Sequence, residues 1–479
     1  MKYFTLRYTT PLALLLAASG ANAFDVEQPF GPNPTLPEPQ RGLLPDMTVP
    51  EPAEWGDRQP TVPEGYTITR IASDLKVPRQ TIMLPNGDIL VAEGSGGNAP
   101  ALKPKDVIAG YIKDQGNTSV ESGNRLTLLR DENGDGNYEQ MIFAEDLNAP
   151  YGLALVDNNL YVANQDALVR FDYEEGQTEA SGPPDVIAQL PSEINHHWTK
   201  AMTASADGQY LYVGIGSNSN ITERGMEAEV NRAEVWEIDA ETGAHRPYAT
   251  GLRNPTALAI QPDTEQLWAV VNERDELGPD LVPDYLTSVQ EGGFYGWPYS
   301  YWGQHVDPRV KPEAPEKVES AIAPDYSLGS HVAPLGLAFS TPAMGEEYAE
   351  GVFVGEHGSW NRADPVGYKV SFIPFNNGQI SDSDPIDFAS GFLTDDGRAL
   401  GRPVGVTIDP EGALIIADDL TNAIWRVTPD NPPVQQTPEA DTAETEDSET
   451  ASSDIEGSET EGSATEDLDT DESVTETTE

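Results

Sequence analysis

Polar and cationic side chains that could bind an anion stand at matching places in a repeated sequence pattern. They are His197, the pair Arg253 and Asn254, and Arg402. An arginine suits this task because its planar fork binds a carboxylate through two hydrogen bonds. If the fold brings these positions together, they predict an anion-binding pocket. The alternative is that they serve local turns and salt bridges on an acidic surface.

The repeated pattern is a proline or aromatic residue, an apolar strand, a turn with Asp, Asn or Gly, and a second strand with a polar end. It starts at Pro78, Pro150, Trp198, Pro255, Pro334 and Pro403. Short strands between turn residues, without a sustained 3.6-residue period, predict an all-β protein. Six such units favour a six-bladed β-propeller with long loops between blades, and a β-sandwich is the alternative. In a propeller the residues before each start converge around the axis, so His197, Asn254 and Arg402 are expected at one mouth.

One acidic turn offers oxygen ligands to a calcium ion. Asp131, Asn133 and Asp135 have the spacing of the first half of an EF-hand loop, and a glycine follows them. Ile142 stands where that loop would carry its glutamate. A plain hairpin turn therefore explains these residues at least as well as a calcium site.

A long insertion after the fourth repeat contains Gly278 and Pro279 and the glycine-rich, aromatic segment 292–298. Glycine and proline at this density indicate an irregular loop close to the channel mouth. The backbone carbonyls of such a loop could bind a hard cation. A rigid loop packed by its aromatic residues is the alternative interpretation.

Composition and missing motifs exclude several functions. The chain of 479 residues has a net charge of −54, which would repel phosphate backbones, so no nucleic-acid partner is expected. It contains no cysteine, which excludes disulfides, thiol nucleophiles and cysteine-ligated metals. The sequence has no H-E-x-x-H or G-x-S-x-G motif, and an all-β fold excludes a Rossmann nucleotide site.

The composition also divides the chain into four parts. Residues 1–23 combine a basic start, a short apolar run and the sequence Ala21-Asn22-Ala23, which predicts a cleaved signal peptide. The mature protein is therefore expected to be exported, either periplasmic or secreted, with no membrane span. A proline-rich arm over 24–63 precedes the propeller domain at 64–430, and the acidic segment 431–479 is expected to be a disordered tail.

Several motifs, in order along residues 64–429, resemble the soluble quinoprotein sugar dehydrogenases, and more closely their sorbosone and pyranose dehydrogenase branch. The motifs are LRNPTALAI, the segment from NERDELGPD to YWGQH, GEHGSWNR and GRPVGVTIDPEGALIIADD. The resemblance implies a six-bladed propeller that binds pyrroloquinoline quinone (PQQ) and Ca²⁺ at the channel mouth. It also implies oxidation of an aldose or sorbosone-like sugar by hydride transfer to PQQ. Electrons would then pass to a cytochrome or quinone acceptor.

The resemblance assigns roles to individual residues. His197 in HWTKAM matches the catalytic base, and Arg253 and Asn254 in LRNP match residues that contact the quinone oxygens and the substrate. Arg402 matches an arginine that faces the cofactor carboxylates. Lys200 is a weaker assignment as a cofactor contact.

Two assignments concern the insertion and the loop after the fifth repeat. Gly278 and Pro279 match the pair whose backbone carbonyls hold the Ca²⁺, which would polarise the reacting carbonyl of PQQ. Arg362, in the SWNR loop, is a further weak assignment as a cofactor contact, because the glucose enzymes place a lysine on the preceding strand.

The sequence departs from the glucose-oxidising members in one place. Where they carry an aspartate that orients the histidine, this chain has Ser217 and Asn218, so the orientation of His197 is an open question. Two other functions stay open. One is a calcium lactonase or related hydrolase on the same fold, and the other is a non-catalytic propeller that binds a carbohydrate or a partner.

Overall fold

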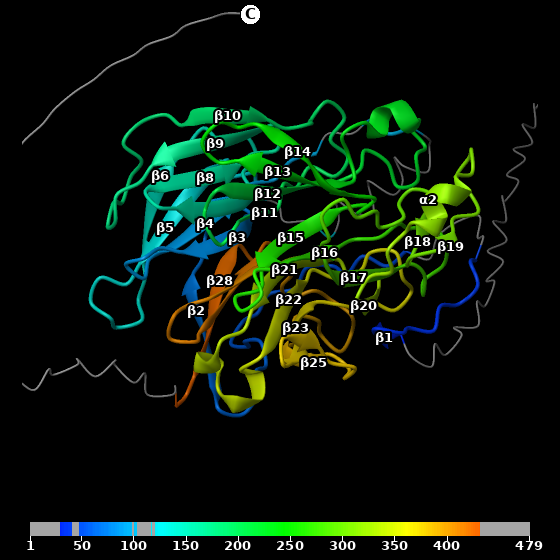
Figure 1. The fold of residues 1–479 in the computed structure, drawn as a ribbon. Coiled ribbons are helices and arrows are strands. Elements are labelled where there is room, and N and C mark those ends of the chain that lie inside the picture. Colours follow the sequence, from blue (N-terminus) through cyan, green and yellow to red (C-terminus); the bar gives the residue numbers. More distant parts are fainter. Residues whose placement is uncertain (1–28, 41–46, 98–99, 103–115, 117–119, 432–479) are drawn as a thin grey trace, which may run out of the picture. The chain divides into compact units, whose positions relative to one another are not determined.

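The computed structural model describes residues 29–40, 47–97, 100–102, 116 and 120–431 (Figure 1). The predicted signal peptide, and the predicted tail apart from Asn431, lie outside these residues. Among the described residues, no helix combines the length and the apolar character needed to cross a membrane.

Six antiparallel sheets make up the body, and each forms one blade of four main strands. Blade 1 holds β3 (Pro78–Met83), β4 (Ile89–Glu93), β5 (Arg125–Arg130) and β6 (Glu139–Ala144). Blade 2 holds β7 (Gly152–Val156), β8 (Asn159–Ala163), β9 (Ala167–Asp172) and β10 (Asp185–Gln189). Blade 3 holds β11 (Met202–Ala204), β12 (Tyr210–Ile215), β13 (Glu234–Asp239) and β14 (His245–Thr250).

The remaining blades have the same plan. Blade 4 holds β15 (Pro255–Ile260), β16 (Leu267–Val271), β17 (Pro283–Ser288) and β20 (Tyr326–Ser330), and β1 (Phe30–Gly31) extends it at the outer edge. Blade 5 holds β21 (Pro334–Phe339), β22 (Gly351–Glu356), β23 (Lys369–Asn376) and, both paired with β23, β24 (Gln379–Ile380) and β25 (Ile386–Ala389). Blade 6 holds β26 (Pro403–Ile408), β27 (Leu414–Asp418), β28 (Ala423–Pro429) and β2 (Tyr66–Ala72).

Short elements occupy the loops between these strands. They are η1 (Met226–Glu229), β18 (Ser300–Tyr301), β19 (His305–Val306), α2 (Pro315–Glu319), η2 (Pro342–Met344) and η3 (Glu346–Tyr348). Strands β18 and β19 pair with each other inside the insertion of blade 4, and α2 follows them (Figure 1).

The predicted six-bladed propeller is confirmed. The first strands of the blades contact one another in the cyclic order β3, β7, β11, β15, β21, β26 and back to β3. Four of these strands begin at the predicted starts Pro78, Pro255, Pro334 and Pro403, and the other two begin shortly after Pro150 and Trp198. The ring closes because β2, from the start of the propeller, pairs with β28 at its end, with Tyr66 opposite Pro429.

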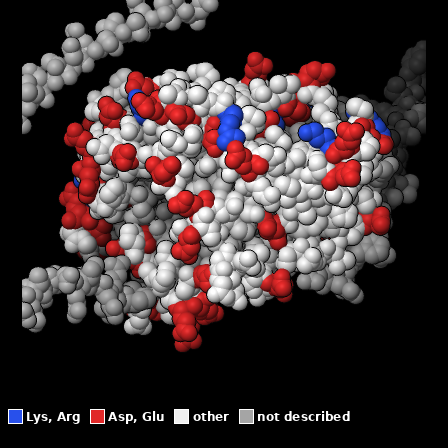
Figure 2. Space-filling model, viewed as in Figure 1, with Lys and Arg blue, Asp and Glu red and all other residues white. Residues whose placement is uncertain are grey.

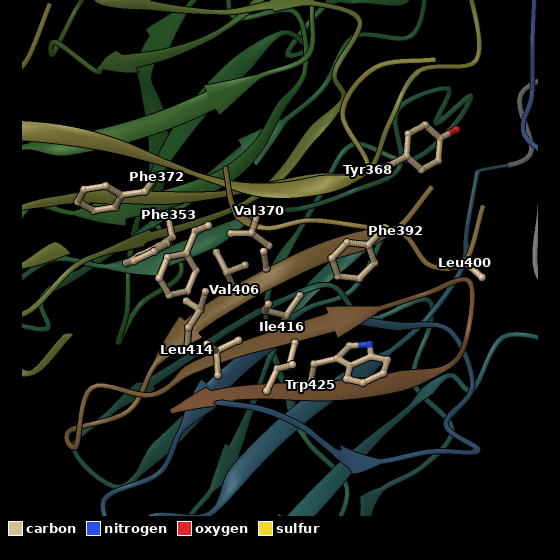
Figure 3. Close-up of a cluster of buried hydrophobic side chains, with 14 of the residues drawn as sticks. Phe353, Tyr368, Val370, Phe372, Phe392, Leu400, Val406, Leu414, Ile416 and Trp425 are labelled. Carbon is tan, nitrogen blue, oxygen red and sulfur yellow. The ribbon is translucent and has the colours of Figure 1, made fainter. Parts of the chain in front are cut away.

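The blades are held together by apolar contacts on both of their faces. The second strands β4, β16, β22 and β27 are buried along their whole length, which explains why their sequences are apolar apart from the acidic residue that ends β4, β22 and β27. Six buried clusters each lie between two neighbouring blades. Figure 3 shows the one between blades 5 and 6, where Phe353 and Phe372 face Leu414 and Val406.

Charges divide between the surface and the interior. Figure 2 shows Asp and Glu side chains scattered over the visible face, with few Lys and Arg among them. Charged side chains of both signs are also buried: the basic ones are Lys200, Arg232, Arg253, Arg274 and Arg402, and acidic ones such as Glu229, Asp284 and Asp419 are buried as well. Burying a cation is costly unless polar partners surround it, so these side chains indicate built polar sites inside the ring.

Candidate active site at the propeller mouth

The same backbone hydrogen bond recurs in several blades. It joins the residue that follows the second strand of a blade to the residue that precedes the first strand. In it, the residue after a second strand donates its N–H to the carbonyl of the residue before a first strand. The pairs are Gly94 to Val77 and Asn272 to Asn254, both 3.0 Å, His357 to Ala333, also 3.0 Å, and Asp419 to Arg402, 3.3 Å. Both sets of residues therefore line one mouth. The repeat pattern predicted this for the residues that precede the first strands.

His197 is held in one tautomer by the end of strand β12. Its Nδ1 lies 2.8 Å from the backbone carbonyl of Ser217 and 3.0 Å from the Ser217 hydroxyl. The hydroxyl donates its own proton to the Ser219 carbonyl, 2.6 Å away, so both oxygens of Ser217 accept from Nδ1–H. No hydrogen bond to a described residue uses Nε2, which is left as a basic nitrogen. The Ser217 backbone thus orients His197 where an aspartate was missing from the sequence.

Its surroundings keep His197 neutral. Burial lowers the pKa of His197 well below 6.5, and the nearby charges of Arg253, His196 and Arg232 lower it further. The bond to the Ser217 backbone raises this pKa but does not outweigh them. His197 can therefore accept a proton near neutral pH.

A buried carboxylate supports the loop that orients His197. Glu229 accepts the Asn218 N–H at 2.7 Å and the hydroxyl of Ser219. Asn218 in turn donates its side-chain amide to the Ala228 carbonyl, 2.8 Å away. These hydrogen bonds hold the Ser217–Ser219 turn in place, and with it the Ser217 carbonyl that accepts from His197 Nδ1–H.

Arg253 and Asn254 lie beside this loop. The Arg253 carbonyl accepts the Ser217 N–H at 2.8 Å, which joins blade 4 to blade 3. The Arg253 side chain donates to the backbone carbonyls of Asn220, Asn272 and Glu273. Asn254 is buried, and its Oδ1 has no hydrogen-bond partner among the described residues.

Gly216 makes the meeting of these side chains possible. A methyl group at Gly216 would collide with Asn254 Oδ1 and with Cβ of His197. Glycine thus allows the unpaired amide oxygen of Asn254 to lie next to His197. An unpaired buried acceptor of this kind is open to a donor from a water or a ligand.

A second polar group gathers at the end of blade 6. Asp419 binds Arg79 at 2.6 Å and His357 Nε2 at 3.1 Å. Burial alone would raise the pKa of Asp419, but the charges of His357, Arg79 and Arg402 hold it well below its usual range. Arg402 is buried, its Nε has no partner among the described residues, and its guanidinium lies 5.9 Å from the Tyr368 ring centroid.

Arg79 connects the two groups. Its guanidinium lies 5.3 Å from the ring centroid of Trp198, the neighbour of His197 in sequence, and its Nε donates to the Gly94 carbonyl at 2.8 Å. His197 and the polar group of Asp419, His357 and Arg402 therefore belong to one mouth. The expected convergence of His197, Arg253, Asn254 and Arg402 is what the fold produces.

The insertion loop with Gly278 and Pro279 joins the mouth through side chains. His331 Nε2 lies 3.1 Å from the Gly278 carbonyl, and Arg362 Nη1 donates to the Pro279 carbonyl. Asn361 links His331, 3.0 Å away, to Asp275, 2.6 Å away, and Asp275 lies 3.8 Å from Arg253.

The loop with Gly278 and Pro279 does not offer a free set of calcium ligands. Both carbonyls that would hold it accept hydrogen bonds, one of them from a permanent cation. Within the described ranges no three His, Asp or Glu side chains are grouped so that they could hold a metal ion. The residues therefore do not fit a resident Ca²⁺ at this loop.

Two further predicted sites have local partners, and the first is Lys200. Lys200 is fully buried, and its Nζ donates to Asn195 Oδ1 at 3.1 Å and to the Trp198 carbonyl at 3.0 Å. Burial, with a smaller effect from Arg232, lowers its pKa well below the usual value. Lys200 braces the loop that carries His197, and its contact with a cofactor stays a prediction.

The second is the turn between β5 and β6, which has the hairpin arrangement. Asp131 accepts the N–H groups of Asp135 and Gly136, at 3.1 and 2.8 Å, and Asn133 Oδ1 accepts the Asp135 N–H at 3.0 Å. Asp135 accepts the Asn137 N–H at 2.9 Å. The oxygen atoms thus stabilise the turn itself, and calcium at this turn stays a prediction.

Sequence reasoning missed Arg79, His331, His357 and Asp419 as site residues. A signal for two of them existed, because His357 and Asp419 directly follow the apolar strands β22 and β27. The polar residue that follows such a second strand forms a backbone hydrogen bond to the residue before a first strand, which places it at the mouth. Arg79 directly follows the start Pro78, and only the packing against Trp198 directs it into the mouth.

Together these features define a six-bladed β-propeller with a neutral, oriented histidine and converging cations at one mouth. Residues 60–283 and 310–430 match the TrAA12-like family, which is a family of pyrroloquinoline-quinone-dependent oxidoreductases. The chain belongs to this family, as the resemblance in its motifs predicted.

Individual proteins agree with this placement. A protein of Borreliella burgdorferi described as uncharacterized is 28% identical over 76% of this chain and 94% of its own. The aldose sugar dehydrogenase YliI of Escherichia coli is 24% identical over 51% of this chain and 64% of its own.

Solved structures share the fold. The holo PQQ domain of pyranose dehydrogenase from Coprinopsis cinerea has a TM-score of 0.63 and 18% identity, covering 79% of this chain and 98% of that one. A calcium structure of the Trichoderma reesei enzyme of family AA12 has a TM-score of 0.62 and 20% identity, covering 80% of this chain and 99% of that one.

Proposed function

We propose that this protein is an exported, PQQ-dependent dehydrogenase that oxidises an aldose or a sorbosone-like sugar. The observation that carries this proposal is the tautomer of His197. Its Nδ1–H is fixed on the Ser217 carbonyl at 2.8 Å, which leaves Nε2 free to take a proton. Two similar proteins are a pyranose dehydrogenase and an aldose sugar dehydrogenase, which supports a sugar as the substrate.

The mouth fits PQQ by charge and by its unpaired atoms. PQQ is a tricarboxylate, and Arg402, Arg79 and Arg253 supply permanent positive charge around one opening. Arg402 Nε and Asn254 Oδ1 are buried without partners among the described residues, so a ligand with acceptors and donors would satisfy both. When bound, PQQ would supply the acceptor for the hydride that leaves the sugar carbon.

The chain's own residues would handle the proton. His197 Nε2 would take it from the sugar hydroxyl as the hydride leaves carbon. The Ser217 carbonyl, already bound to Nδ1–H, would hold the ring in place and accept a stronger bond from the imidazolium. Arg253 and Arg232 disfavour that charged form, so the proton would be released again before the next turnover.

The remaining parts of the proposal rest on the sequence. Export to the periplasm or the medium follows from the predicted signal peptide, and a cytochrome or quinone is the proposed electron acceptor. Calcium takes no part in the proposed mechanism, since the Gly278 and Pro279 carbonyls already accept hydrogen bonds. A calcium lactonase gains no support, because the described residues hold no cluster of acidic or histidine ligands.

Reconstitution tests the proposal. Purified protein without cofactor would be mixed with PQQ, with and without Ca²⁺, and dye reduction followed with aldoses, sorbosone and lactones. Sugar-dependent dye reduction that requires PQQ is the expected result. Absence of PQQ binding would refute the proposal, and lactone hydrolysis without PQQ would favour the hydrolase instead.

A further inference from the structure

The loop Gly278–Asp280 is filled by a side-chain cation from a different blade. Arg362, in the loop after β22, donates from Nη1 to the Pro279 carbonyl, and its Nη2 lies 3.0 Å from the Asp280 carboxylate. The pair is largely buried, with side-chain exposures of 19% for Arg362 and 16% for Asp280. A carbonyl and a carboxylate are also the ligands that Ca²⁺ prefers, so the guanidinium occupies a cation position.

The neighbouring carbonyl is occupied as well. Asn361 donates its side-chain amide to His331 Nδ1 at 3.0 Å, so the proton of His331 is on Nε2. Nε2–H then donates to the Gly278 carbonyl at 3.1 Å. On the other side of the loop, the Gln40 N–H donates to the Leu277 carbonyl at 2.7 Å.

We infer that Arg362 supplies the positive charge of this loop in place of a calcium ion. A Ca²⁺ bound to the Pro279 carbonyl would lie against the guanidinium that binds the same oxygen, and the two like charges would repel. Asp280 offers one negative charge, which the single charge of Arg362 already balances. A metal therefore binds this loop only by displacing Arg362.

The guanidinium also has a donor left for a ligand. Arg362 Nε is buried and has no hydrogen-bond partner among the described residues. Arg362 thus holds the loop with its two Nη atoms and keeps Nε–H for an acceptor. A bridging cation between the loop carbonyls and an anion would have the same two-sided arrangement.

Calorimetric titration of metal-free protein with CaCl₂ tests the inference without PQQ and without turnover. Arg362→Gln removes the charge and frees the Pro279 carbonyl and the Asp280 carboxylate, so it should bind Ca²⁺ at least about tenfold more tightly than wild type. The double variant Arg362→Gln with Asp280→Asn should lose this gain. Arg309→Gln is the matched control, because Arg309 also binds a carbonyl and a carboxylate, both of Glu276, in the same insertion. It should leave the Ca²⁺ isotherm unchanged.

Two outcomes would overturn the inference. One is an unchanged or weaker Ca²⁺ affinity in folded Arg362→Gln. The other is a tight Ca²⁺ site in wild type that disappears in Asp280→Asn, a measurement that decides the question even if Arg362→Gln does not fold. PQQ affinity of wild type, measured by fluorescence quenching, should be equal in Ca²⁺ and in EGTA. Failure of PQQ to bind would refute the proposed function, whereas the calcium isotherms would still decide the role of Arg362.

Discussion

Replacement of His197 by asparagine separates the loss of a base from the loss of a loop contact. The asparagine amide can take the position of Nδ1 and donate to the Ser217 carbonyl, which lies 2.8 Å from Nδ1 in the wild type. It has no basic nitrogen at the position of Nε2. His197→Asn should therefore keep its melting temperature and its PQQ affinity, while kcat falls.

The expected loss of kcat follows from the protonation state in the structure. The pKa of His197 lies below 6.5, so at pH 7 at least about three quarters of the molecules carry the basic form. The full contribution of a positioned base, about 10²- to 10⁴-fold, is then available to the wild type. Its removal should raise the activation free energy by about 3 to 5 kcal/mol.

Initial rates of dye reduction at saturating sugar, with enzyme saturated in PQQ, measure this loss. His196→Asn is the matched control, since His196 is the adjacent histidine, with its ring centroid 4.7 Å from that of His197. The control should keep kcat within about threefold of wild type at pH 7, because it leaves the base in place. A His197→Asn enzyme that binds PQQ and also stays within this range would refute the role of His197 as the base.

Three further predictions follow from the same geometry. The lowered pKa of His197 places the acid limb of kcat/KM below pH 6.5, since the base stays unprotonated to lower pH than a free histidine; a midpoint above 6.5 would assign the limb to another group. Arg402→Ala should weaken PQQ binding roughly 10- to 100-fold by fluorescence titration, through loss of a charged hydrogen bond, whereas Arg426→Ala, which removes the ion pair with Asp409 in the same blade, should not. Asp284→Asn should lower the free energy of unfolding by about 1–3 kcal/mol in urea, because Asp284 accepts the N–H groups of Glu273 and Ala333 at 2.7 and 2.9 Å; an unchanged midpoint and slope would contradict this.

The sequence alone predicted the fold class and the polar positions that the fold brings to one mouth. Each blade is encoded locally, by an apolar strand, a turn and a buried second strand, so the starts at Pro78, Pro255, Pro334 and Pro403 could be read directly. Since a propeller brings equivalent positions together, the repeat also predicted that Asn254 and Arg402 share a mouth. Composition is local as well, and it predicted the propeller domain and the parts that flank it.

Only the tertiary structure decided how the ring closes and how the site is oriented. Pairing of Tyr66 with Pro429 joins segments that are distant in the sequence. The residue pattern of a strand does not specify which distant strand pairs with its edge. His197 is oriented by the Ser217 carbonyl, a backbone atom that every residue type offers, so side-chain identity in the sequence left its orientation open. The availability of the Pro279 carbonyl is likewise decided by Arg362, a residue from another blade. Backbone acceptors become specific sites only when folding places a particular donor beside them.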